Sequence, residues 1–343
     1  MAKVAVIGLD CATPQLVFGP WRRELPCLDG LMRRGIWGKL LSTHPPITVP
    51  AWTSMMTGRD PGELGLYGFR NRKDHTYDGY TLAHSGMVNS PRLWDLLGAA
   101  GGRSLVLGVP QTYPPRAING EMVACFLTPS TRTEYTYPAS LKAEVERVAG
   151  GYVLDVEDFR TEDKAALLGR IYEKTRKHFR VATHFLETRP WDLFAMVEMG
   201  VDRIHHGFWS HMDPAHRRHT PANPYENAIR DYYRYVDGLI DECLRAMPPE
   251  TIVAVVSDHG ARALEGGVCL NEWLISAGYL RLQGAVGGPT PIGRAPIDWK
   301  RTRAWGDGGY YGRLFLNVKG REPQGVIDPK DYERVRDDLV SAI

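Results

Sequence analysis

Residues 3–10, Lys-Val-Ala-Val-Ile-Gly-Leu-Asp, contain the short apolar run that decides the fold class. A run of this length that ends at a carboxylate is typical of a buried parallel strand with an acid at its C-terminal edge. Similar apolar runs recur at residues 38–41, 104–109, 192–197 and 251–256. Helix-like stretches occur at residues 140–148, 163–187 and 225–247. This alternation predicts an α/β fold with a mainly parallel central sheet.

The chain has 343 residues, which is enough for one large domain or two ordinary ones. Two stretches, residues 59–90 and 110–138, break the alternation of strands and helices. Irregular segments of this length in an α/β enzyme are typical of active-site loops. Because no linker rich in proline, serine or glycine divides the chain, we expect a single domain over residues 1–343 with insertions near these two stretches.

The composition excludes several classes of protein. A formal net charge of +2 argues against a protein that binds nucleic acid through an overall positive charge. No apolar run approaches the ~18 residues that a membrane helix needs, and the first residues do not have the pattern of a signal peptide. The five cysteines are scattered without a Cys-x-x-Cys pair, which indicates a reducing compartment. We therefore expect a cytoplasmic protein that binds neither membranes nor specific nucleic acids; its oligomeric state does not follow from the sequence.

Asp10 and Thr48 are the first two candidates for chemistry. An aspartate at a strand end can bind a ligand, although by itself it is more often a helix cap. Thr48 lies in Pro45-Pro46-Ile47-Thr48-Val49-Pro50, just before a segment that could begin a helix. Free N–H groups at a helix N-terminus stabilise negative charge, so this hydroxyl could approach a phosphate. The alternative is that Thr48 or Thr53 only caps the helix.

Two further motifs combine aspartate with histidine. Asp202 and His206 are four residues apart, so on a helix they share one face and could bind a single ion. His205 would then point elsewhere. Asp258 and His259 directly follow the 251–256 run in Ser-Asp-His-Gly, where the strand ends and both side chains could reach a metal. Gly260 permits the close turn there.

These motifs share a position near the ends of predicted elements, where open α/β sheets bind their ligands. Carboxylate, imidazole and hydroxyl groups together suit zinc, manganese or iron. A threonine hydroxyl is a poor nucleophile at neutral pH, and a bound divalent cation overcomes this by stabilising the alkoxide. The sequence therefore predicts metal-dependent chemistry with Thr48 at its centre.

This combination of motifs resembles the alkaline phosphatase superfamily, and more narrowly the prokaryotic branch of the type I phosphodiesterase/nucleotide pyrophosphatase family. The resemblance runs from residue 3 to about residue 328. It rests on Val-Ile-Gly-Leu-Asp10, on the stretch from Thr48 to Gly58, on Pro61-Gly62, on Asp202 with His206, and on Ser-Asp258-His259-Gly. It implies a three-layer αβα sandwich like that of alkaline phosphatase.

The resemblance also implies roles for individual residues. Two divalent ions, Zn²⁺ or Mn²⁺, would be bound, the first by Asp10, Thr48, Asp258 and His259, and the second by Asp202 and His206. Thr48 would be the nucleophile and become transiently phosphorylated. The implied substrate is a small-molecule phosphate ester, either a phosphodiester or a nucleotide-like compound.

The sequence departs from the family pattern at three places. Ala51 and Trp52 stand where the family often has Asn-His, and Asn71 is a slightly displaced candidate for the asparagine that holds a substrate phosphate oxygen. No histidine follows His259, although the family completes its second metal site with one. We expect either a chain that continues beyond Ile343, a weakly held second ion, or a substituting group, and we favour the first explanation.

Other functions remain open on the sequence alone. A phosphonate or phosphomonoester hydrolase of the same superfamily would use the same residues. A phosphate-binding or sensor protein with impaired catalysis is a further alternative, and the missing histidine is its best support. A sulfatase is disfavoured because Cys11 is followed by Ala-Thr-Pro and no arginine.

Overall fold

The computed structural model describes residues 2–308 and 311–343. These residues form two compact units. The first unit contains the chain up to Phe69 together with Ala83–Glu265, and the second contains Arg70–Leu82 together with the residues from Gly266 onward. The division into compact units does not test whether the chain is one domain, so the single domain expected over residues 1–343 remains a prediction.

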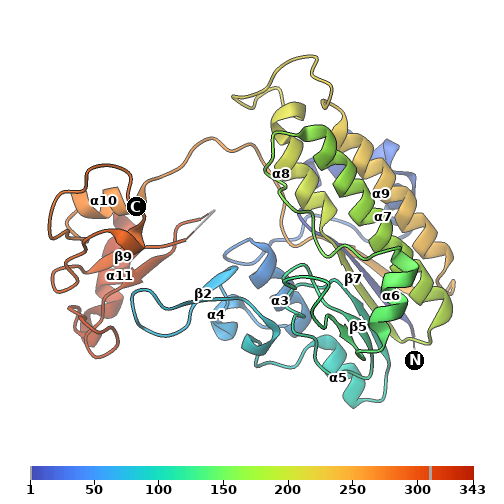
Figure 1. Ribbon diagram of the computed structural model, residues 1–343, viewed down its shortest axis with the longest axis horizontal. Coiled ribbons are helices and arrows are strands. Elements are labelled where there is room, and N and C mark those ends of the chain that lie inside the picture. Colours follow the sequence, from blue (N-terminus) through green and yellow to red (C-terminus); the bar gives the residue numbers. More distant parts are fainter. Residues whose placement is uncertain (1, 309–310) are drawn as a thin grey trace. The chain divides into compact units, whose positions relative to one another are not determined.

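A six-stranded sheet organises the first unit, with the strand order β6-β5-β4-β7-β1-β8. All neighbours pair in parallel except β5 and β6, which are antiparallel (Figure 1). The strands are β1 Val4–Leu9, β4 Ser104–Leu107, β5 Gly120–Val123, β6 Thr136–Tyr137, β7 Leu193–Glu198 and β8 Ile252–Val256. The predicted, mainly parallel α/β sheet is confirmed.

Helices cover both faces of this sheet (Figure 1). One face carries α6 Leu141–Ala149, α7 Lys164–Thr188, α8 Gly200–Met212 and α9 Ala228–Arg245, and the other carries α3 Thr48–Thr57 and α5 Leu93–Ala99. The first unit also contains α1 Pro14–Val17, α2 Pro26–Arg34 and α4 Pro61–Leu64. The three-layer αβα sandwich expected from the resemblance is therefore present.

The alternation of side chains along β1 explains the two layers of helices. Ala5, Ile7 and Leu9 belong to the apolar core that includes residues of α7, α8 and α9. Val6, between them in sequence, belongs to a separate core that includes Trp52 of α3. Successive side chains of a strand point to opposite faces, so a strand that is apolar throughout needs cover on both sides.

The longest helices form where the apolar spacing predicted them. Along α9, Ile229, Tyr233, Val236 and Ile240 are all buried, and they follow each other at intervals of three and four residues. This spacing places them on one face of a helix, which packs against the sheet. The predicted helices at 140–148, 163–187 and 225–247 thus correspond to α6, α7 and α9.

The strand expected at residues 38–41 is wrong. This segment has no regular secondary structure, and Leu40 and Leu41 are 75% and 86% exposed. A short apolar run becomes a strand only when a neighbouring strand supplies its hydrogen bonds, and within the described residues none pairs with it. β8 is consequently an edge strand, and its residue Ile252 is 58% exposed.

The two irregular stretches also contain regular elements. Residues 110–138 contribute β5 and β6 to the sheet of the first unit. Residues 59–90 contain α4 and a separate two-stranded antiparallel ribbon of β2 Arg70–Arg72 and β3 Tyr80–Leu82. These stretches are therefore only partly loops.

The second unit has a hydrophobic core of its own. Its other elements are α10 Leu270–Ser276, β9 Ala304–Gly306, β10 Leu314–Leu316 and α11 Tyr332–Ala342, and β9 and β10 pair in antiparallel fashion. The core gathers Leu274, Leu280, Trp305, Val335 and Leu339 among other apolar residues. Among the described residues, no helix of either unit has the length and apolarity needed to cross a membrane.

Candidate metal centre

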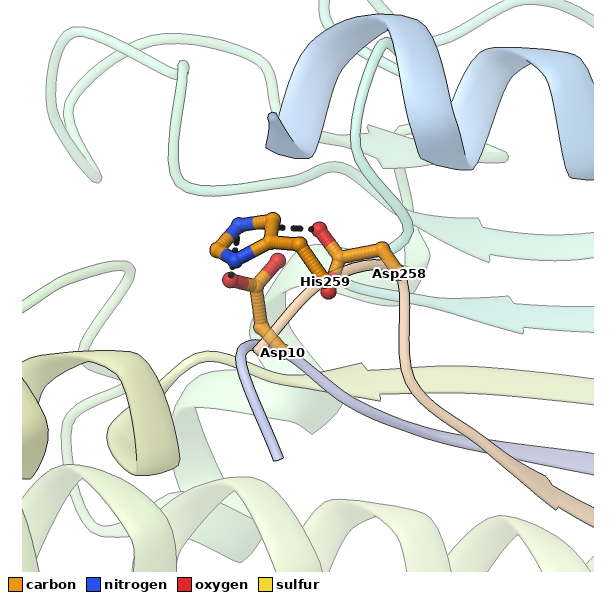
Figure 2. Close-up of side chains that lie close together, drawn as sticks. All are labelled: Asp10, Asp258 and His259. Carbon is orange, nitrogen blue, oxygen red and sulfur yellow. Dashed lines mark ion pairs between the residues drawn. The ribbon is translucent and has the colours of Figure 1, made fainter. Parts of the chain in front are cut away.

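Asp10, Asp258 and His259 lie together at one edge of the sheet in the first unit (Figure 2). Asp10 follows β1, whereas Asp258 and His259 follow β8, and these two strands are parallel neighbours. Their carboxyl ends therefore meet at the same edge. His259 Nε2 is 3.6 Å from Asp10 Oδ1 and 3.2 Å from Asp258 Oδ2.

Each of the two carboxylates has one oxygen held by a donor and one left open. Asp10 Oδ2 accepts a hydrogen bond of 2.7 Å from the indole Nε1 of Trp52. Asp258 Oδ1 accepts one of 3.0 Å from the backbone N–H of Cys11. Asp10 Oδ1 and Asp258 Oδ2 are buried without a hydrogen-bond partner among the described residues, and both lie beside His259 Nε2.

This geometry fits a cation. Two ligands on one tetrahedral Zn²⁺, with bonds of about 2.1 Å, are separated by about 3.4 Å, close to the distances found here. Open carboxylate oxygens and an imidazole nitrogen are also the donors that Zn²⁺ and Mn²⁺ accept. The two open, buried carboxylate oxygens lie beside the same imidazole nitrogen, so the three atoms together fit the donor set of one bound cation.

The pKa values of the two carboxyls agree with this assignment. Burial, together with the negative charge of Asp258, raises the pKa of Asp10 well above its usual range. Burial also raises the pKa of Asp258, to about 7. Two buried acids side by side are costly to ionise, and a bound divalent cation offsets that cost.

Thr48 stands next to this cluster. It is buried, it is the first residue of α3, and its Oγ1 lies 3.2 Å from His259 Nε2. The helix begins here because Ile47 still has an extended backbone, and no side chain caps this end. The capping alternative is therefore wrong for Thr48; Thr53 lies inside the helix and donates its hydroxyl to the carbonyl of Val49.

Asp202 and His206 share one face of α8, as their spacing predicts. Asp202 Oδ1 lies 3.4 Å from His206 Nε2, and Asp202 Oδ2 accepts a hydrogen bond from the guanidinium of Arg203. Burial alone would raise the pKa of Asp202. The hydrogen bond from His206 and the charges of His206 and Arg203 outweigh burial, so that pKa lies well below its usual range.

A buried ion pair fixes where α8 begins. Glu198, the last residue of β7, accepts a hydrogen bond of 2.6 Å from the backbone N–H of Gly200. The ammonium of Lys174 lies 3.0 Å from both oxygens of Glu198. A Cβ at position 200 would lie 2.0 Å from the hydroxyl of Tyr232, so glycine is needed at this close approach. These contacts set the start of the helix that presents Asp202 and His206.

The chain matches the model of the type I phosphodiesterase/nucleotide pyrophosphatase family over residues 4–343. It belongs to this family. The family is named for type I phosphodiesterases and nucleotide pyrophosphatases. A search of curated proteins found no match.

Solved structures of similar fold include two kinds of enzyme. Phosphonoacetate hydrolase from Sinorhizobium meliloti 1021, in complex with phosphonoacetate, is 15% identical with a TM-score of 0.53 over 85% of this chain and 66% of that one. The same enzyme with phosphonoformate gives a TM-score of 0.51 at 15% identity, over 80% of this chain and only 62% of that one. Murine ectonucleotide pyrophosphatase/phosphodiesterase 5, an inactive variant in complex with AMP, is 13% identical with a TM-score of 0.52, over 100% of this chain and 71% of that one.

Three residues of the site were missed by the motifs. Trp52 and Cys11 hold the carboxylates through N–H groups, and Arg203 holds Asp202. The position of Trp52, four residues and so one helical turn after Thr48, indicates a place near the site or in the core, but not its hydrogen bond to Asp10. Cys11 left no such signal: its φ of +65° lies in the left-handed region, where glycine is the usual residue.

Other histidines and Asn71 lie outside this cluster. The ring of His205 contacts the hydroxyl of Tyr233 at 3.2 Å and the thiol of Cys11 at 3.5 Å, so it points elsewhere than His206. His211 packs against the rings of Phe208 and Tyr225. Asn71 is a buried residue of β2 in the second unit, and its contact with substrate stays a prediction.

Proposed function

We propose that this chain hydrolyses a phosphodiester or nucleotide-like ester, with a divalent cation held by Asp10, Asp258, His259 and Thr48. The observation that carries the proposal is the pair of open, buried carboxylate oxygens beside His259, with the hydroxyl of Thr48 in the same cluster. Zn²⁺ or Mn²⁺ is the cation we expect. Asp202 and His206 would hold a second, weaker ion.

The reaction would proceed in two displacements at phosphorus. The bound cation would lower the pKa of the Thr48 hydroxyl, so that its oxygen is available as an alkoxide. Thr48 Oγ1 attacks phosphorus, the new O–P bond forms, the ester P–O bond breaks, and the alcohol leaves with its electron pair and takes up a proton. Water then attacks the phosphothreonine, which releases the phosphate product and restores the hydroxyl.

The positions of the side chains support this role for Thr48. The hydroxyl is held at the N-terminus of a ten-residue helix, where backbone N–H groups favour the negative charge of a phosphate. The inactive form of the murine neighbour carries a threonine-to-alanine substitution. We transfer that requirement for threonine to Thr48.

The remaining parts of the proposal concern substrate and location. The murine neighbour in complex with AMP supports a small-molecule phosphate ester as substrate. Phosphonoacetate hydrolase also keeps phosphonate cleavage as the second candidate function. All five cysteines are free, which supports the proposed location in a reducing cytoplasm.

Turnover of model esters tests the proposal. With added Mn²⁺ or Zn²⁺, we expect bis-p-nitrophenyl phosphate to be cleaved faster than the p-nitrophenyl monoester. Thr48→Ala should reduce turnover to the background rate, whereas Thr48→Ser should retain part of it because the attacking oxygen remains. Circular dichroism of Thr48→Ala is the control for an intact fold.

Two outcomes would contradict this function. An active Thr48→Ala variant would show that the nucleophile is another group. A wild-type protein that binds inorganic phosphate and Mn²⁺ but turns over neither ester nor a phosphonate would instead support a sensor protein.

A further inference from the structure

Arg203 is a buried arginine that is fixed beside the second aspartate–histidine pair. Its side chain is 8% exposed and lies against the ring of Phe159, with 4.5 Å between guanidinium carbon and ring centroid. Nε and Nη2 donate to the two oxygens of Asp155 at 2.8 and 2.6 Å, and Nη1 donates to Asp202 Oδ2. Such a bidentate contact fixes the position of the guanidinium. This group stays protonated at any ordinary pH.

The carboxylates of Asp10 and Asp258 therefore differ from that of Asp202 in the number of oxygens that are open to a cation. Asp10 and Asp258 each keep one oxygen without a partner among the described residues, and no arginine or lysine is paired with them there. Asp202 has both oxygens engaged, one by Arg203 and the other next to His206. The positively charged guanidinium of Arg203 is therefore already bonded to Asp202 before any ion binds.

Charge decides the consequence. A divalent cation that binds at Asp202 and His206 meets the fixed positive charge of Arg203 at the same carboxylate. Like charges this close repel strongly in a buried site, where water screens them little. The cation would also bind a carboxylate whose negative charge is already shared with a guanidinium.

We infer that Arg203 supplies at Asp202 the positive charge that a second divalent ion would bring, so that this chain binds one ion tightly and a second only at much higher concentration. The inference rests on the proposed function for its first ion. Arg203 is thus a positioning residue, which holds Asp202 and the turn of α8 around it when a single ion is bound.

The number of bound Mn²⁺ ions tests this inference without measuring turnover. Purified wild-type protein is titrated with Mn²⁺ alone, and bound metal is counted by equilibrium dialysis and by the electron paramagnetic resonance signal of free Mn²⁺. We expect one tight ion in the wild type. Arg203→Met should strengthen binding of the second ion by at least about tenfold, because the repelling charge is gone.

Two further variants serve as controls. Arg203→Lys keeps the positive charge but not the bidentate contact, so this variant should still bind the second Mn²⁺ ion weakly. Arg245→Met removes an exposed arginine that pairs with Asp241 at the end of α9, and it should leave both ions unchanged. Circular dichroism of each variant shows whether the fold is retained.

The wild-type titration alone can overturn the inference, even if Arg203→Met does not fold. Two equally tight ions in the wild type would overturn it and leave the proposed ester hydrolysis at Thr48 intact. The inference would also be overturned if Arg203→Met folds and binds the second Mn²⁺ ion no more tightly than the wild type does. A wild type that binds no Mn²⁺ would overturn the proposed function, and this inference with it.

Discussion

Trp52 belongs to the apolar core and to the candidate site at once. Its side chain is fully buried between α3 and the sheet, and its Nε1 donates to Asp10. Gly8 makes room for the ring, because a Cβ there would lie 2.5 Å from an indole carbon of Trp52. The core thus fixes which oxygen of Asp10 stays open.

Trp52→Phe should weaken ion binding while the fold is kept. Phenylalanine fills most of the space but cannot donate to Asp10, and loss of such a supporting hydrogen bond typically costs about 10–100-fold in metal affinity. Calorimetric titration with Mn²⁺ measures this change.

Trp94→Phe is the matched control, since Trp94 of α5 is equally buried in the same core and is not among the residues that contact Asp10. Equal affinity in Trp52→Phe and the wild type would show that the indole N–H does not support the site.

The motifs name the side chains that the structure gathers in the first cluster, but not the groups that hold them. Thr48 begins α3, Asp10 follows β1, and Asp258 and His259 come shortly after β8; the parallel sheet brings such positions together. The N–H donors of Trp52 and Cys11 depend on tertiary contacts and on one left-handed backbone angle, which local patterns do not encode.

At the scale of elements, prediction succeeded wherever an apolar run had a partner in the sheet. β1, β4, β7 and β8 all form within or next to the runs that the sequence marked. The run at 38–41, Gly-Lys-Leu-Leu, also contains adjacent leucines but stays exposed. Local composition records a tendency to extend, whereas a strand also needs a hydrogen-bonding neighbour that lies elsewhere in the sequence.

Substitution of the exposed run should leave stability nearly unchanged. Replacing Leu40 and Leu41 by lysine removes apolar surface that is mostly in water, so we expect the free energy of unfolding to change by less than about 0.5 kcal/mol for each residue. Aggregation at high concentration should fall, because charges beside an open strand edge oppose edge-to-edge pairing. Urea denaturation and light scattering measure the two effects.

Val106→Lys is the control for a buried strand position. Val106 is fully buried in β4, so a lysine there should prevent folding. A loss of more than about 2 kcal/mol on substitution of Leu40 and Leu41 would mean that this run is packed in solution.

At the scale of the whole molecule, each of the two units has its own core, and all residues of the candidate metal centre belong to the first. The chain crosses between the units near residues 69, 82 and 265. Neither this division nor its crossings followed from the sequence, because no linker composition marks them.

Metal binding should therefore stabilise the two units differently. At an ion concentration of 100 times the Kd, a site present only in the folded state contributes about 2.7 kcal/mol. We expect Mn²⁺ to slow hydrogen exchange in β1, β8 and α3 of the first unit and to leave β9, β10 and α11 unchanged. Hydrogen-exchange mass spectrometry resolves these segments.

Asp258→Asn should abolish the slowing of hydrogen exchange by Mn²⁺, because it takes away one open carboxylate oxygen of the cluster. Equal protection of both units in the wild type would contradict a site that is confined to the first.

The contact between Trp52 and Asp10 also gives the molecule an optical signal. Indole emission responds to the charge next to its N–H, and a cation on the open oxygen of Asp10 would change that charge beside a buried ring. Of the nine tryptophans, Trp52 donates its N–H to Asp10. The fluorescence difference between the wild type and Trp52→Phe would then follow the filling of the site in real time, without a dye or a coloured substrate.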